Sequence, residues 1–282
     1  TPGDLPTSAA WARWIGREDE DQVAELVILG SSGWIPRDGR MTTSLAVRTD
    51  EDLVIFDAGS GLGRLSSEPL RRLLPAPERP INVFLTHLHY DHVIGLSFLP
   101  ALWKNPTVVH VPTGIGDGDG PEALDRLLSA PFFPLRFDEL LPAISRRPVG
   151  AGEWQLGDLR LEARRQEHPG GSLAYRVNDW FALLTDCAYD PDGAGFAQGV
   201  SVLVHEAWSS EQDDPGGTQA RVSGHSTAGQ AARLAKDAGV SELLLSHLPP
   251  AENGYYNQML EEARAIFPRT NLCEDGLSRS LG

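Results

Sequence analysis

The sequence predicts an α/β fold in which β-sheets carry helices on their outer faces. Two observations predict it: short apolar runs bounded by Gly, Pro and Asp have the length of buried strands, and helical patterns alternate with such runs along most of the chain. Neither an internal repeat nor a linker interrupts this alternation. We therefore expect a single domain spanning residues 1–282, in which residues 1–22 form a peripheral N-terminal extension.

The individual elements follow from these patterns in order along the chain. The predicted strands are residues 24–30, 44–49, 52–59, 81–86, 107–111, 158–165, 173–185, 200–206 and 242–247. The predicted helices are residues 93–102, 121–129, 226–238 and 255–267. Segments 113–121 and 209–224 are predicted to be loops, because Gly, Asp and Ser dominate their composition.

Composition restricts the partners and the surroundings of the protein. The formal net charge of -15 disfavours a general affinity for nucleic acid or for anionic membranes. Cys187 and Cys273 are the only cysteines, too few for a disulfide framework or a Cys-rich zinc site. No apolar stretch reaches the roughly 18 residues of a membrane span, and residues 1–20 lack the apolar core of a signal peptide. We therefore expect a cytoplasmic protein without membrane contact.

The segment THLHYDH, residues 86–92, follows the apolar run INVFL and holds three of the chain's 8 histidines. Imidazoles together with a carboxylate are ligands of Zn²⁺ and similar divalent ions. A purely structural cluster would have to satisfy six ring nitrogens in a loop and would repel itself on protonation. The spacing of His87 and His89 suits one ion, while Asp91 and His92 face a neighbouring position, so we expect two ions.

Three more residues stand where apolar strand candidates end: His168 in QEHPGG, Asp186 in LLTDCA and His247 in LLLSHLPP. The last side chain of a buried strand is held rigidly as the chain enters a loop, a favourable place for a ligand. Taken singly, each could have a structural role instead. Asp186 could bridge two cations by placing one carboxylate oxygen on each.

The motif H-x-H-x-D-H, which stands here as His87-Leu88-His89-Tyr90-Asp91-His92, resembles the signature of the metallo-β-lactamase superfamily. The resemblance runs from about residue 25 to residue 274, and DAGSGLGRL at residues 57–65 is similar to an early segment of the family. It implies an αββα sandwich of two mixed β-sheets, with helices on the outer faces and the metals at one edge. It implies one ion held by His87, His89 and His168, another held by Asp91, His92 and His247, and Asp186 between them. Asp186 and His247 point to the two-zinc hydrolases rather than to β-lactamases with a cysteine ligand.

LVHEAW at residues 203–208 and SGHSTAGQAARLAKDAGV at residues 223–240 resemble paired elements of the ribonuclease Z and phosphodiesterase branch. In that branch the resemblance implies that Glu206 orients His225, which donates a hydrogen bond or proton at the scissile phosphate. Independently, Thr227 and Gln230 fit a capping box, which would leave His225 just ahead of a helix N-terminus, a favourable place for an anionic oxygen. The alternative is that His225 only caps this helix.

Two other histidines are assigned supporting roles. His205 lies within a strand pattern, so we expect it to make hydrogen bonds behind the metal site rather than to bind metal. His110 matches no motif and is expected to be structural.

HPGGSLAYRV at residues 168–177 resembles a segment of bacterial cyclic-phosphate or general phosphodiesterases. Asp186 follows His168 by only 18 positions, which leaves no room for the long tRNA-gripping arm of many bacterial ribonuclease Z enzymes. Together with the acidic net charge, this spacing argues against tRNA as a partner and favours a small-molecule phosphodiester.

These observations predict a metal-dependent hydrolase, most specifically a phosphodiesterase for a small or cyclic phosphodiester that uses water activated between two metal ions. Asp91 would orient this water, and Glu206 and His225 would act on the departing oxygen. The alternatives are a lactonase, a β-lactamase-like or other ester or amide hydrolase on the same centre, and a non-catalytic, metal-stabilised binding protein. Zinc is the expected metal, although His and Asp ligands also suit manganese and iron.

Loops 30–42, 113–140 and 209–222 are expected to determine the substrate. Trp34, Arg37 and Arg40 are candidate contacts for a base or a phosphate. The segment APFFPLRFDEL, residues 130–140, could cover the substrate or could be part of the core or of a dimer contact. A homodimer is the default expectation for the assembly.

Overall fold

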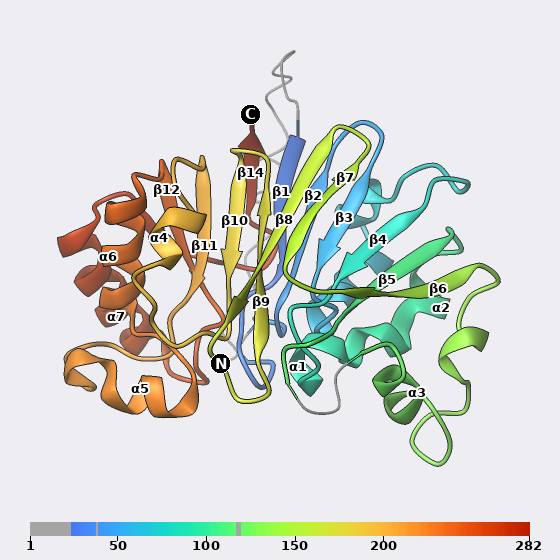
Figure 1. Cartoon of the computed structure of the whole chain (residues 1–282), viewed down its shortest axis with the longest axis horizontal. Helices are drawn as coiled ribbons and strands as arrows, with labels where there is room; N and C mark the ends of the chain where they lie inside the picture. The colour runs from blue at the N-terminus through green and yellow to red at the C-terminus, as the bar shows by residue number, and fades with distance from the viewer. Residues whose placement is uncertain (1–23, 38, 117–119) are drawn as a thin grey trace, which may run out of the picture.

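Buried apolar runs and Gly-rich turns build two β-sheets of seven strands each in the computed structural model, which describes residues 24–37, 39–116 and 120–282. The sheets stand side by side in the middle of the molecule, and helices lie on the outer side of each sheet (Figure 1). This arrangement confirms the predicted αββα sandwich. The expected N-terminal extension, residues 1–22, lies outside the described residues.

The first sheet has the order β14-β1-β2-β3-β4-β5-β6. Its strands are β1 (Ala24–Gly30), β2 (Ser44–Arg48), β3 (Leu53–Phe56), β4 (Ile81–Phe84), β5 (Thr107–Pro112), β6 (Ile144–Val149) and β14 (Ser278–Leu281). Strands β3 to β6 pair in parallel, whereas the pairs that join β14, β1, β2 and β3 are antiparallel. Because β3, β4 and β5 are parallel, their carboxyl ends meet at one edge of this sheet.

The second sheet has the order β13-β12-β11-β10-β9-β8-β7. Its strands are β7 (Gly152–Leu156), β8 (Leu159–Gln166), β9 (Ser172–Val177), β10 (Phe181–Leu184), β11 (Val202–Glu206), β12 (Glu242–Ser246) and β13 (Thr270–Leu272). The predicted strand 173–185 is two antiparallel strands instead, because the chain turns at Asn178, whose φ is 47°. Strands β10 to β13 pair in parallel, so their carboxyl ends also share one edge.

The helices are α1 (Tyr90–Val93), α2 (Leu99–Leu102), α3 (Ala123–Leu127), α4 (Gly193–Phe196), α5 (Thr218–Ser223), α6 (Ala228–Ala238) and α7 (Asn253–Ile266). Short 3₁₀ segments span Ser60–Ser66, Leu70–Leu73, Ile94–Phe98, Phe137–Glu139 and Pro215–Gly217. The predicted helix 93–102 is therefore broken by a 3₁₀ turn. The loop prediction for 209–224 is wrong in part: α5 forms within it and ends at Gly224, whose φ of 80° suits a helix terminus. No helix in the described ranges is long and apolar enough to cross a membrane.

Three apolar layers hold the sandwich together. One lies between the sheets, where the rings of Phe56, Tyr175 and Phe181 contact one another. A second lies between the first sheet and the segments on its outer side, and a third between the second sheet and α4, α6 and α7. Phe137 is buried in the second layer, and Phe133 packs against it, so part of segment 130–140 belongs to the core. With both faces of each sheet covered, the loops at the strand ends are the places left for a site.

Candidate metal centre

Five of the seven sequence-predicted ligands lie just beyond the carboxyl end of a strand, and the other two lie in the helix that follows β4. His87 and His89 follow β4, His168 follows β8, Asp186 follows β10, and His247 follows β12. Helix α1, which contains Asp91 and His92, lies at the lower edge of the molecule in Figure 1, below β4. The two sheets therefore contribute ligand candidates to one edge of the sandwich.

Four of these side chains form a first group. One potential ligand atom from each of His87, His89, His168 and Asp186 lies within 4.8 Å of the others. His168 Nε2 is 3.3 Å from His89 Nδ1 and 3.6 Å from Asp186 Oδ1. His87 Nε2 is 3.9 Å from the same Asp186 oxygen.

Asp91, His92 and His247 form a second group by the same criterion. His92 Nε2 lies 3.3 Å from His247 Nε2 and 3.4 Å from Asp91 Oδ2. Asp186 adjoins this group as well, because its Oδ2 is 3.2 Å from His92 Nε2 and its Oδ1 is 3.3 Å from His247 Nε2. The structure thus brings together all seven predicted ligand candidates, with Asp186 between the two groups.

The hydrogen bonds around these rings test whether the groups fit a cation. Asp57 accepts the Thr86 hydroxyl proton, so His87 Nδ1–H donates to Thr86 Oγ1 at 3.0 Å and the lone pair of His87 is on Nε2. Among the residues that the structure describes, that buried Nε2 atom has no hydrogen-bond partner. Burying a nitrogen lone pair that receives no hydrogen bond costs free energy of folding. Binding of a divalent cation to this nitrogen would remove that cost. Imidazoles and carboxylates that converge in this way fit Zn²⁺, Mn²⁺ or Fe²⁺.

A residue that the sequence argument missed orients the second group. Asp57 Oδ2 accepts a hydrogen bond from His92 Nδ1–H at 2.8 Å, and Asp57 Oδ1 accepts one from the Thr86 N–H at 2.7 Å. Asp57 is fully buried and follows β3 directly. A carboxylate on the far nitrogen fixes the tautomer of a ligating histidine and directs its free nitrogen to the metal. The signal in the sequence was an acidic residue at the end of the apolar run LVIF.

Backbone strain and close approach mark the same edge. Asp57, Asp186 and His247 have φ values of 61°, 50° and 47°, a left-handed conformation that costs non-glycine residues about 1 kcal/mol or more. A Cβ atom on Gly33 would lie 2.6 Å from the His247 ring, and one on Gly59 would lie 2.3 Å from the Asp91 carbonyl oxygen. The backbone is therefore packed tightly around the two groups.

The charges of the two groups depend on each other. Burial disfavours a charged His92, but the carboxylates of Asp186, Asp57 and Asp91 raise the pKa of His92 well above its usual value. Burial and the neighbouring His92 lower the pKa of His87 well below the usual range. Burial alone would raise the pKa of Asp186, yet the surrounding histidines hold it well below normal. Cation binding would thus release a proton from the histidines, as expected of ligands that bind deprotonated.

Glu206 and His225 form a pair beside the second group. Glu206 is buried at the end of β11; its Oε2 lies 2.9 Å from His225 Nδ1, and its Oε1 accepts a hydrogen bond from the Cys187 N–H. A ring nitrogen of His225 lies within 4.8 Å of ligand atoms of Asp186 and His247. Burial would lower the pKa of His225, but the Glu206 carboxylate overcomes this and raises that pKa to about 9. The structure therefore places the predicted acid pair next to the predicted ligands.

The position of His225 is set by its neighbours. Thr227 is the N-cap of α6, and its capping box with Gln230 is formed as predicted, with bonds of 2.9 and 3.1 Å. The cap is thus Thr227, which excludes the alternative that His225 only caps this helix. The Trp208 ring stacks on the His225 ring at 4.6 Å between centroids. Trp208 was not among the residues predicted to take part in the site.

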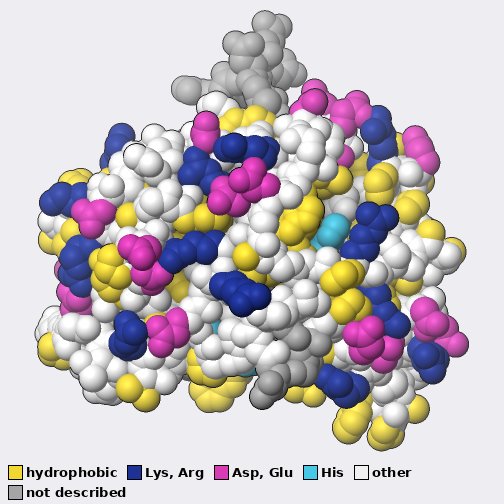
Figure 2. Space-filling view, in the orientation of Figure 1, with side chains coloured by type: hydrophobic (Ala, Val, Ile, Leu, Met, Phe, Trp, Pro, Cys, Tyr) yellow, Lys and Arg dark blue, Asp and Glu magenta, His cyan; other side chains and the backbone are white. Residues whose placement is uncertain are grey.

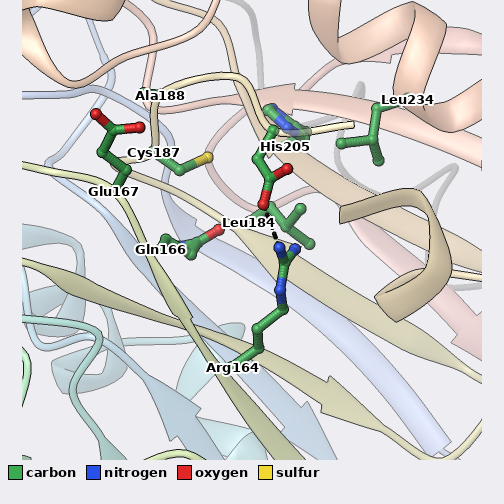
Figure 3. A pocket seen from close by; sticks show the side chains of 9 residues that line it. Arg164, Gln166, Glu167, Leu184, Cys187, Ala188, His205 and Leu234 are labelled. Carbon is green, nitrogen blue, oxygen red and sulfur yellow. Dashed lines mark hydrogen bonds and ion pairs between the residues drawn. The ribbon is translucent and has the colours of Figure 1, made fainter. Parts of the chain in front are cut away.

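His205 lies behind the centre rather than in it. Its Nδ1–H donates to the Glu206 carbonyl at 2.8 Å, and its buried Nε2 has no partner among the described residues. Figure 3 shows the ring at a small pocket with Cys187 and Arg164, which has room for about one water molecule. His110 is farther away on β5, where it stacks on Phe84 at 3.9 Å and donates to Asn82 Oδ1.

The loop candidates separate into different roles. Arg40 donates to Ser31 Oγ and to the Cys273 carbonyl, and Arg37 pairs with Glu252 at 2.6 Å, so the contacts of both hold the loop to the protein. Trp34 differs, because its backbone N–H donates to Asp91 Oδ2 at 2.7 Å.

This fold and this His and Asp cluster define a known class of protein. A family model described as a beta-lactamase superfamily domain matches residues 53–248, and the chain belongs to the metallo-β-lactamase superfamily. It is a hydrolase of that superfamily and resembles ribonuclease Z, as predicted.

Particular relatives place the chain more narrowly. The ribonuclease Z of Methanothermobacter thermautotrophicus is 25% identical over 308 aligned positions, which cover 89% of this chain and 94% of that protein. Among solved structures, the metallo-β-lactamase fold protein YhfI of Bacillus subtilis has a TM-score of 0.69 at 21% identity, covering 92% of this chain and 99% of that one. A diphosphatase from the PhnP family has a TM-score of 0.67 at 18% identity, covering 91% and 97%. These two similarities concern the fold.

Proposed function

We propose that the protein is a metal-dependent phosphodiesterase that acts on a small or cyclic phosphodiester. The observation that carries the proposal is the Glu206–His225 pair, which adjoins the candidate metal groups at Asp186 and His247. A buried Glu–His pair can protonate or stabilise a departing phosphate oxygen, and this is the role that the proposal gives to Glu206 and His225. The similarity to a protein named ribonuclease Z supports phosphodiester chemistry.

The cluster would hold two divalent cations, with zinc the first choice. The first would be bound by His87, His89 and His168, and the second by Asp91, His92 and His247, with Asp186 shared between them. Bound cations would supply Lewis acidity and a water molecule that ionises near neutral pH.

The side chains of the chain itself would then position the reaction. Asp91, which is proposed to orient the attacking water, is fixed by the Trp34 N–H. Glu206 holds Nδ1 of His225 and favours a positive charge on the ring, so the other ring nitrogen is free to donate to a phosphate oxygen. The backbone N–H of Cys187 holds Glu206 from its other oxygen. These contacts keep the pair in one geometry before a substrate arrives.

A small substrate agrees with the short segment between His168 and Asp186. Most of this segment forms the hairpin of β9 and β10, which belongs to the second sheet, so no residues remain there for an inserted arm. The alignment with the ribonuclease Z of M. thermautotrophicus runs over 308 positions, more than the 282 residues of the chain, so that relative has segments that this chain lacks. The expectation that tRNA is not a substrate stays a prediction.

Hydrolysis of bis(4-nitrophenyl) phosphate by zinc-loaded protein, beside a β-lactam and a lactone, tests the proposal. We expect turnover of the phosphodiester that is lost in Asp186→Ala and falls about 10²- to 10⁴-fold in His225→Ala. Turnover of the lactone or β-lactam alone would move the function to the alternative hydrolase class. Phosphodiester turnover that His225→Ala leaves intact would remove the observation on which the proposal rests.

We also propose that residues 1–282 form a single domain, that the protein is cytoplasmic and that it forms a homodimer. Sedimentation equilibrium tests the last point, because a mass of one 30.6 kDa chain at micromolar concentration would contradict it.

A further inference from the structure

Trp34 combines two unfavourable properties beside the candidate metal centre. Its φ of 62° is left-handed, which is rare for a bulky residue and costs energy. Its side chain is also 67% exposed, although burying a large aromatic ring would normally stabilise the fold. Strained residues persist only where the surrounding structure fixes them, and they gather at binding sites.

Hydrogen bonds on both sides of Trp34 fix its backbone. Its own N–H donates to Asp91 Oδ2 at 2.7 Å, and the preceding Gly33 N–H donates to the Leu248 carbonyl at 2.9 Å. Ser32 Oγ donates to the Ile35 carbonyl at 2.9 Å, which closes the turn around Trp34. The turn is therefore joined to one proposed metal ligand and to the residue that follows another, His247.

The indole ring does not explain this strain by its own packing. Within the described residues it stacks on no other aromatic ring and lies under no cationic side chain, unlike the ring of Trp208. The structure thus holds an exposed aromatic ring, on a backbone fixed by hydrogen bonds, at the edge where the ligand candidates meet.

Exposed apolar side chains also stand next to Asp91 in the chain, the residue to which the Trp34 N–H donates. Tyr90 stands in the chain between His89 and Asp91 and is 72% exposed, and Ile94 one turn later is also exposed. Figure 2 shows hydrophobic side chains at several places along the lower edge of the molecule. The two nearby arginines, Arg37 and Arg40, already contact Glu252 and the Cys273 carbonyl. A substrate would meet ring and hydrocarbon surface beside the centre.

We propose that Trp34 is the platform on which an aromatic ring of the substrate stacks, so that the site selects phosphate esters with a nucleobase or aryl group. The proposal rests on the proposed phosphodiesterase function and specifies its substrate class. Stacking of a base on an aromatic side chain changes affinity by about 5- to 150-fold. The phosphate would lie at the metal groups and the ring on the indole.

Binding of adenosine 5′-monophosphate and of ribose 5-phosphate to zinc-loaded protein, measured by calorimetry, tests the proposal without any turnover. We expect wild-type protein to prefer the nucleotide. Trp34→Ala and Trp34→Gly should lose about 5- to 150-fold of that preference with unchanged affinity for ribose 5-phosphate, and Trp34→Phe should keep most of it. Trp34→Gly separates this role from a structural one, because glycine adopts the observed φ without strain and should not lower the melting temperature. Phe132→Ala tests the alternative that the ring is bound by segment 130–140 instead: this side chain is 83% exposed, and the preference for the nucleotide should survive its removal.

Equal affinity of the wild-type protein for both compounds, or a preference that survives Trp34→Ala, would overturn the proposal. Hydrolysis of bis(4-nitrophenyl) phosphate is measured separately on the same preparations. Selective nucleotide binding through Trp34 without phosphodiester hydrolysis would contradict the proposed function but support the stacking role of Trp34. Phosphodiester hydrolysis without a preference for the nucleotide would support the proposed function and contradict the role of Trp34.

Discussion

Replacing Asp57 by Asn changes one buried atom and should weaken one of the two proposed cation sites. Asp57 Oδ1 accepts the Thr86 N–H, which can only donate, so the amide oxygen of Asn must take that position. The amide NH₂ group then faces His92 Nδ1, where Asp57 Oδ2 now accepts a hydrogen bond at 2.8 Å. Two donors cannot face each other, so His92 should move its proton to Nε2. That nitrogen is the one directed at Asp91 and His247.

The size of the effect follows from this tautomer change. Loss of the partner that orients a ligating histidine lowers metal affinity by about 10- to 100-fold, or about 1.4 to 2.8 kcal/mol. The cation bound by Asp91, His92 and His247 should be the one affected, because the Thr86 hydroxyl that supports His87 can still donate to the oxygen at the Oδ1 position, 3.1 Å away. The metal-free protein should also lose stability, because the substitution removes one partner of a buried pair and leaves His92 without the acceptor of its Nδ1–H.

Competition with a chromophoric zinc chelator measures both sites in one titration. We expect two classes of site in Asp57→Asn, one of them unchanged and one weakened, and the wild-type profile in the exposed control Asp138→Asn. Unchanged affinity at both sites would refute the tautomer argument. Equal weakening at both sites would show that Asp57 acts through the fold.

Three further predictions concern the surroundings of the centre. Gly33→Ala should displace the His247 ring, because the new methyl group would lie 2.6 Å from it, and zinc titration should show one site weakened. Trp208→Ala should lower kcat for a phosphodiester several-fold with little change in KM, since its ring stacks on His225 at 4.6 Å and lies farther, at 5.6 Å, from the ring of the proposed ligand His247. Trp208→Phe should restore most of the rate. Burial and Arg147 lower the pKa of His110 to about 4, so the unfolded chain binds its proton first and stability falls as pH drops from 6.5 towards 4. The stability advantage of wild-type protein over His110→Gln should therefore shrink by about 2 kcal/mol between pH 7 and pH 5 in urea unfolding, and an equal advantage at both values would contradict the assignment.

The central strands and the ligand candidates could be predicted because local sequence determines them. Strands β3 and β10 are continuous apolar runs, and β4, β11 and β12 are mostly apolar, so a polar residue at or just after the end of such a run stands out. The motif from His87 to His92 is compact enough to be recognised without any knowledge of the fold.

The edge strands could not be predicted, because they lack that signal. Strand β6 has the sequence ISRRPV and β7 has GEWQL, and each is mostly polar and largely exposed. An edge strand has a partner on one side only and often carries charged residues and proline, so its sequence resembles that of a loop. Its pairing depends on a neighbour that the sequence does not identify.

Contacts between residues that are far apart in the sequence could not be predicted either, because the local pattern carries no signal for them. Asp57 lies 35 positions before His92 in the chain, and Trp208 lies 17 positions before His225. Nothing in the local pattern says that these side chains meet. Their roles follow only after the sheets are assembled, which is why the support of the centre was less visible than its ligands.

The division of the ligand candidates between the two sheets has a consequence for how the chain holds together. Asp91 and His247, whose side chains lie 3.3 Å apart, are 156 positions apart in the sequence. A cation shared by them would cross-link the two halves of the polypeptide, much as a disulfide closes a long loop and narrows the ensemble of the unfolded chain. Full occupancy of the centre by metal would then indicate that the two halves have come together. Fragments produced by cutting the chain between β6 and β7 would each contain only some of the proposed ligands.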